Sequence, residues 1–176
     1  MRISLLTLAL LCAIASPAHA AISGLDLLNG RPLSVENGKR GSVVIFLSVK
    51  CPCSNTHLSR IRQLVKDFPA FAFVLVHSNT DEPLPEAAAY FRKADLGAPV
   101  IQDEKSRLAD QFKALKTPHA FVLSPSGEIL YRGGVTNSAN GETADQQLLR
   151  SALEDLSAAR SVRTPSSRTL GCVIAR

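Results

Sequence analysis

The pattern of apolar and polar positions predicts alternating strands and helices between residues 22 and 158. The continuous segment 42–47 (Ser-Val-Val-Ile-Phe-Leu) is rich in β-branched and aromatic residues and predicts a buried strand. After Cys51, apolar residues recur every three or four positions as far as Phe68, which is typical of an amphipathic helix. The first turn of a helix accepts a proline such as Pro52. The sequence therefore places Cys51 where a core strand meets a helix.

The remaining segments continue this alternation. Asn29-Gly30 predicts a β-hairpin over 22–35, and Pro125-Ser126-Gly127 predicts a second hairpin late in the chain. Further elements are expected in this order: strand 70–77, helix 85–93, an extended piece 98–102, helix 105–114, strand 120–123, strand 128–133 and helix 144–158. Strands joined by a crossover helix run parallel. We therefore expect an α/β fold with a mixed sheet, helices on both faces and an N-terminal hairpin.

Length and composition fit one domain that follows a targeting segment. The chain has 176 residues, 45% of them hydrophobic, which is enough for a single core. Residues 1–20 combine Arg2, a short apolar stretch and Ala18-His19-Ala20, and this predicts a signal peptide cleaved after Ala20. We expect an exported protein, periplasmic if the source is bacterial, with no stable membrane anchor.

The mature sequence is expected to form a domain at 21–160 and a C-terminal tail at 161–176. The tail ends in the apolar segment 170–174. A disordered terminus would not need these apolar residues, so we expect this segment to dock on the domain. The formal net charge is +5, of which Arg2 contributes one, leaving +4 after cleavage. This small excess is not interleaved with aromatic residues, and no nucleic-acid partner is expected.

The mature sequence keeps three cysteines, Cys51, Cys53 and Cys172, too few for a disulfide scaffold but suited to redox or metal chemistry. At a helix start, the unpaired backbone N–H groups and the helix dipole favour a thiolate. The pKa of Cys51 is therefore expected to lie below that of a free thiol. Lys50 adds positive charge if its side chain turns towards the sulfur.

Several motifs together resemble the thioredoxin fold, and more narrowly its redoxin branch of exported thioredoxin-like and alkyl-hydroperoxide-reductase-like proteins. These motifs are the strand before Cys51-Pro52, Thr117-Pro118 before a strand, Cys-Pro-x-Ser-Asn at 51–55 and Gly-Cys-x-Ile at 171–174. The resemblance implies that Cys51 is the attacking thiol. It also implies a cis Pro118 that faces Cys51, with the backbone of Thr117 available to pair with a substrate peptide.

The sequence departs from ordinary thioredoxins at the position of the second cysteine, which Ser54 occupies, so a Cys-x-x-Cys disulfide is excluded. The hydroxyl of Ser54 is expected to donate to the thiolate of Cys51. We expect Cys172 to be the partner of Cys51, with a free or intermolecular Cys172 as the alternative. On a helix Cys53 points away from Cys51, so a disulfide between the two would be strained. Cys53 therefore has three interpretations: the partner in such a strained disulfide, a buried small hydrophobic residue, or a metal ligand.

These features favour an exported thiol–disulfide oxidoreductase that acts on protein thiols or disulfides, with an upstream thiol reductant or oxidant and no cofactor. One alternative is a copper-binding or copper-delivery module that uses Cys51 and Cys53. Another is a thiol peroxidase, for which Ser48 stands at the usual place before the cysteine. Peroxiredoxins also carry an arginine near the start of the later strand, and here Pro118 stands at that place. Arg132 could replace this arginine only if its side chain reached back towards the site.

The histidines and the remaining acidic residues are expected to have no catalytic role. His57 is expected as an exposed helix residue that needs no function, and His77 and His119 as structural residues. The acidic pairs 81–82 and 103–104 are expected to be solvated loop charges.

Overall fold

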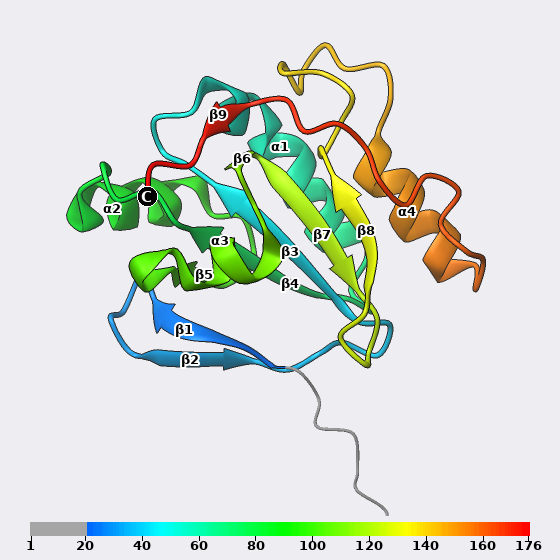
Figure 1. Cartoon of the computed structure of the whole chain (residues 1–176), viewed down its shortest axis with the longest axis horizontal. Helices are drawn as coiled ribbons and strands as arrows, with labels where there is room; N and C mark the ends of the chain where they lie inside the picture. The colour runs from blue at the N-terminus through cyan, green and yellow to red at the C-terminus, as the bar shows by residue number, and fades with distance from the viewer. Residues whose placement is uncertain (1–20) are drawn as a thin grey trace, which may run out of the picture.

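The structure, a computed structural model, describes residues 21–176, so the expected signal peptide lies outside the described residues. Seven strands form one sheet in the order β2-β1-β5-β4-β3-β7-β8 (Figure 1). The strands are β1 (Ile22–Asp26), β2 (Pro32–Val35), β3 (Ser42–Leu47), β4 (Ala72–His77), β5 (Val100–Gln102), β7 (His119–Leu123) and β8 (Ile129–Gly133). The helices are α1 (Pro52–Asp67), α2 (Leu84–Ala94), a short 3-10 helix (Glu104–Ser106), α3 (Arg107–Phe112) and α4 (Leu148–Ser157).

The sheet is mixed, which confirms the expected fold class. Strands β3, β4 and β5 run parallel, while β7 and β8 extend the sheet antiparallel beyond β3. The N-terminal hairpin of β1 and β2 joins the opposite side, where β1 pairs antiparallel with β5.

Strand β3 lies between two hydrophobic cores, because successive residues of a strand point to opposite faces of a sheet. Val43, Ile45 and Leu47 pack in the core that α1, α2 and α4 cover. Val44 and Phe46 pack in the core that α3 covers. All six residues of β3 are buried, so the backbone that leads to Cys51 is fixed from both sides.

The end of the tail forms a second, two-stranded sheet with the segment before β7. Strand β9 (Cys172–Val173) pairs antiparallel with β6 (Lys116–Thr117), and Thr117 lies opposite Cys172. Ile174, directly after β9, is buried in the core on the α3 side. Figure 1 shows the tail crossing the molecule from α4 to β9, beside the start of α1.

Two helices are shorter than their sequence patterns predict. Helix α3 begins at Arg107 instead of residue 105, because the carboxylate of Asp103 accepts hydrogen bonds from the N–H groups of Leu108 and Ala109, the second and third residues of the helix. Asp103 is thus buried, and its expected role as a solvated loop charge is wrong.

Helix α4 begins at Leu148 instead of residue 144. The preceding segment, 138–147, packs over α1 as a loop, and the side chain of Arg60 donates hydrogen bonds to three of its carbonyl oxygens, those of Gly141, Glu142 and Ala144. None of the helices within residues 21–176 is both long and apolar enough to cross a membrane.

Candidate active site

Cys51 caps helix α1 directly beyond the strand β3. Its backbone is extended, with φ −81° and ψ 111°, and the helix begins at Pro52 where the sequence predicts it. The backbone N–H of Ser54 donates to the sulfur of Cys51 at 3.5 Å. The sulfur therefore lies at the positive end of a helix of 16 residues, where negative charge is favoured.

The hydroxyl of Ser54 does not have its expected role. The oxygen of that hydroxyl accepts a hydrogen bond from the backbone N–H of Ser48 at 3.3 Å, and only the backbone N–H of Ser54 is bonded to Cys51. Because Ser54 is fully buried, this bond connects the loop after β3 to the first turn of α1. Ser54 thus supports the position of Cys51 through its backbone.

Thr117 and the tail cover the sulfur of Cys51. The Thr117–Pro118 bond is cis, as the resemblance implies, and the thiol of Cys51 donates to the carbonyl oxygen of Thr117 at 3.1 Å. The backbone of Thr117 is not available to a substrate peptide in this structure, because it pairs with Cys172. A side chain at Gly171 would overlap the same carbonyl oxygen, so a glycine permits this close approach.

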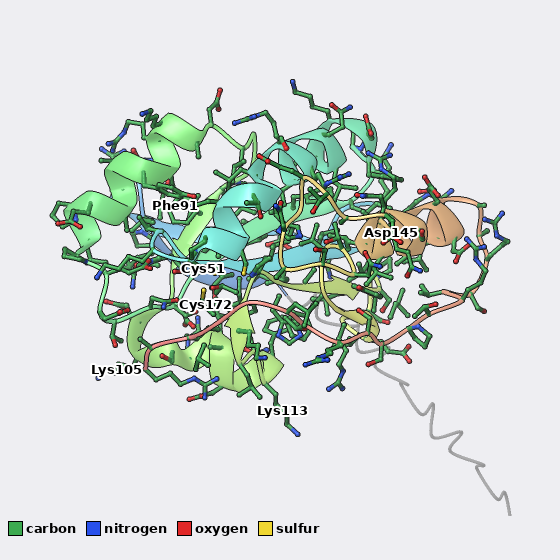
Figure 2. The ribbon with its side chains drawn as sticks, turned by 90° about the horizontal axis from the view of Figure 1, so that it is seen from above. Cys51, Phe91, Lys105, Lys113, Asp145 and Cys172 are labelled. Carbon is green, nitrogen blue, oxygen red and sulfur yellow. The ribbon has the colours of Figure 1, made fainter. Side chains whose placement is uncertain are left out.

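The three cysteines form one cluster, which we call the cysteine cluster. The sulfur atoms of Cys51, Cys53 and Cys172 all lie within 4.8 Å of one another, and no disulfide joins these three residues. Figure 2 shows Cys172 of the tail beside Cys51. The expectation that Cys53 points away from Cys51 is wrong. It assumed helical geometry for both residues, whereas the backbone of Cys51 is extended and turns its side chain differently.

The thiols of the cysteine cluster ionise at different pH values. Burial alone would raise the pKa of Cys51, but hydrogen bonds from the side chains of Cys172 and Thr117 and from the backbone N–H groups of Ser54 and Cys172 outweigh it and lower the pKa to about 7. Burial, the hydrogen bond to Cys51 and the charge of Cys51 raise the pKa of Cys172 to about 12. Burial and the charge of Cys51 also raise the pKa of Cys53. Cys51 is therefore the first of the three to become a thiolate.

Glu82 fixes the loop between β3 and Cys51, although the sequence predicted a solvated charge. Its side chain is buried, with 3% of the residue exposed. The carboxylate accepts hydrogen bonds from the hydroxyl of Ser48 (2.5 Å), the N–H groups of Val49 and Lys50 (2.9 Å each) and Nε2 of His77 (2.7 Å). Burial would raise the pKa of Glu82, but these hydrogen bonds outweigh it and lower the pKa to about 2. A carboxylate thus holds all three residues before Cys51.

The side chain of Lys50 is bonded to the loop that carries Glu82. Its ammonium group donates to the carbonyl oxygen of Asp81 at 2.6 Å. The lowered pKa of Cys51 comes from hydrogen bonds to its sulfur, so the positive charge that the sequence suggested for this purpose is not needed.

His57 is buried beneath the loop 138–147 and is not an exposed helix residue. Only 1% of it is exposed. Its Nδ1 lies 2.6 Å from the carbonyl oxygen of Cys53, and its Nε2 lies 2.8 Å from the hydroxyl of Thr136. Burial lowers the pKa of His57. His57 therefore connects the first turn of α1 to the segment after β8.

The other two histidines pack within the fold, in line with the structural role expected for them. Besides its bond to Glu82, His77 has Nδ1 at 2.8 Å from the side-chain oxygen of Gln102. His119 lies against the ring of Phe121, with 4.4 Å between the ring centroids. Burial, and then the charge of Arg132, lowers the pKa of His119 to about 4.

Neither of the residues expected for a peroxidase has a side-chain hydrogen bond to Cys51. The hydroxyl of Ser48 donates to Glu82, and Arg132 is exposed on β8. The geometry of these two residues therefore adds nothing in favour of peroxide chemistry.

The chain is similar to thiol–disulfide oxidoreductases in sequence. The sporulation thiol-disulfide oxidoreductase A of Bacillus subtilis (strain 168) is 25% identical over 116 residues, which are 64% of this chain and 70% of that protein. A family model described as the AhpC/TSA family matches residues 21–132. The family and this relative support oxidoreductase activity of the redoxin type.

Solved structures share the fold. An uncharacterised conserved protein from Geobacillus kaustophilus superposes with a TM-score of 0.79 at 20% identity, covering 90% of this chain and 89% of that chain. A thioredoxin-class structure, a putative thioredoxin from Neisseria meningitidis, gives a TM-score of 0.54 at 21% identity, covering 67% of this chain and 79% of that chain. The chain therefore has a thioredoxin-like fold and belongs to the AhpC/TSA family.

Proposed function

We propose that the protein is an exported thiol–disulfide oxidoreductase in which Cys51 attacks the substrate and Cys172 resolves the mixed disulfide. The observation that carries the proposal is the position of Cys172 within 4.8 Å of Cys51, at the start of α1. The similarity to the thiol-disulfide oxidoreductase of Bacillus subtilis supports the reaction. The signal-peptide pattern of residues 1–20 supports export.

The reaction is an exchange of two electrons between sulfur atoms. The thiolate of Cys51 attacks a substrate disulfide, one substrate thiolate leaves and takes a proton, and a mixed disulfide remains on Cys51. The sulfur of Cys172 then attacks the sulfur of Cys51, the second substrate thiol leaves, and a Cys51–Cys172 disulfide forms. A dithiol reductant returns this disulfide to two thiols. The same steps run in reverse when the disulfide form meets a substrate dithiol.

The tail must move before a substrate can reach the nucleophile. Only 1% of Cys51 is exposed, whereas Cys172 in front of it is partly exposed. Strand β9 makes only a two-residue pairing with β6. Displacement of this short strand would uncover both the sulfur of Cys51 and the backbone of Thr117, so that protein disulfides gain access to the site.

Cys172→Ser tests the proposal by trapping the mixed disulfide. We expect the mixed disulfide between Cys51 and a chromogenic aromatic disulfide to persist at least about tenfold longer in Cys172→Ser than in Cys53→Ser, because only the first variant lacks the resolving thiol. Intact-mass measurement at successive times after mixing gives both lifetimes. Rapid resolution in Cys172→Ser together with trapping in Cys53→Ser would assign resolution to Cys53 and contradict the proposal.

A further inference from the structure

The cysteine cluster contains one sulfur more than the proposed exchange reaction needs. Within residues 21–176, Cys51, Cys53 and Cys172 are the group of potential metal ligands whose sulfur atoms converge, with all separations at or below 4.8 Å. Cys51 is buried and the other two are partly exposed. The thiol of Cys53 therefore requires an explanation of its own.

The separations suit three thiolates around one ion. Thiolate–metal bonds of about 2.3 Å place three sulfur atoms in a plane about 4 Å apart. The observed limit of 4.8 Å is within about 1 Å of that spacing. A disulfide, with a bond of about 2.05 Å, requires a much larger movement and joins only two of the three sulfurs.

The chemistry of the donors selects the class of ion. Thiolates favour soft cations, chiefly Cu(I) and Zn(II), and structural zinc is almost always bound by four ligands. The nearby histidine, His57, has both ring nitrogens engaged, one with the carbonyl oxygen of Cys53 and one with Thr136. With three sulfurs and no fourth ligand in the described cluster, we propose that Cys51, Cys53 and Cys172 form a trithiolate site for Cu(I).

The fold supports this site from both contributing segments. The N–H of Ser54 at the start of α1 donates to Cys51, and the helix terminus stabilises the negative charge of a thiolate complex. On the other side, the close fit of Gly171 against Thr117 and the burial of Ile174 hold Cys172 in place. Binding replaces thiol protons, so up to three protons leave as the metal binds.

Copper binding is a role beyond the exchange reaction and excludes it while the ion is bound. A Cys51–Cys172 disulfide removes two of the three ligands, so only the reduced protein binds. The proposal does not depend on Cys172 acting as the resolving thiol.

Anaerobic titration of the reduced protein with Cu(I), in competition with a coloured Cu(I) chelator, tests the site. We expect one Cu(I) per chain, sulfur-to-copper charge-transfer absorption in the ultraviolet, and X-ray absorption that shows three sulfur ligands. Cys53→Ser and Cys172→Ser should each weaken binding at least tenfold. Ser59→Ala, on the exposed side of α1, is the control and should bind as the wild type does.

Three results would overturn the site. These are no copper retained against the chelator, an affinity that Cys53→Ser leaves unchanged, or Zn(II) bound more tightly than Cu(I) under the same competition. Disulfide exchange measured on the same wild-type preparation separates the two proposals. Exchange without copper binding rejects only the metal site, and copper binding without exchange rejects only the oxidoreductase.

Discussion

Cys51→Ser is expected to lower the rate of thiol–disulfide exchange by at least about a thousandfold, because the exchange begins with attack by the thiolate and a serine hydroxyl does not ionise near neutral pH. The fold should survive, since Cys51 is the N-cap of α1 and serine is among the best residues at that position. Reduction of a model disulfide by a dithiol, followed with and without the protein, measures the rate. Thermal unfolding checks that the variant is folded.

Cys53→Ser is the matched comparison for this loss. It removes a thiol from the same cluster but leaves both sulfurs of the proposed cycle, so its rate should fall by about tenfold at most. Retained exchange in Cys51→Ser, combined with loss in Cys53→Ser, would reassign the nucleophile.

Glu82→Gln is expected to lower the free energy of unfolding at pH 7 by about 2–4 kcal/mol. Four donors surround the carboxylate of Glu82. A glutamine offers one oxygen and points an N–H₂ group at some of these donors, which leaves buried polar groups unpaired. Chemical denaturation of the reduced protein gives the free energy. Glu128→Gln, an exposed carboxylate after the turn at Gly127, is the control and should change it by less than about 0.5 kcal/mol.

The cost of Glu82→Gln should shrink in acid. The pKa of Glu82 lies at about 2 in the folded protein, below its ordinary value of 4.5. A carboxyl group whose pKa is lowered by folding contributes stability above its unfolded pKa and loses it as the pH falls towards the folded value. The difference in unfolding free energy between the wild type and Glu82→Gln should therefore shrink as the pH falls from 4.5 to 2. An equal difference at pH 7 and at pH 3 would show that the carboxylate charge is not what stabilises the loop.

The strand–cysteine–helix unit could be predicted because its signals are local. The apolar run of β3, the proline at the first helical position and the spacing of apolar residues in α1 lie within 27 consecutive residues, 42–68, and agree with one another. The docking of the tail was also expected from its apolar residues. Its exact partner, Thr117, could not be read from the sequence, because the paired residues of β6 and β9, such as Thr117 and Cys172, are far apart along the chain.

The buried position of Glu82 could not be predicted from the sequence, because most of its partners are distant along the chain. Glu82 and Asp81 look alike in a polar loop, yet three of the four donors to Glu82 come from residues 48–50, more than 30 positions earlier. His57 was predicted to be exposed because the loop that covers it, 138–147, has no pattern that points to α1. Cys53 was misjudged for a local reason, the extended backbone of Cys51, and the cap position of Cys51 was the signal that could have corrected it.

In the proposed reaction cycle, Cys51 and Cys172 form a disulfide. Peptide mapping by mass spectrometry of the oxidised wild-type monomer, after blocking of free thiols, tests it directly. We expect a Cys51–Cys172 crosslink to dominate and Cys53 to carry the blocking group. A dominant Cys51–Cys53 crosslink, or a Cys172 that is blocked in the oxidised monomer, would contradict it.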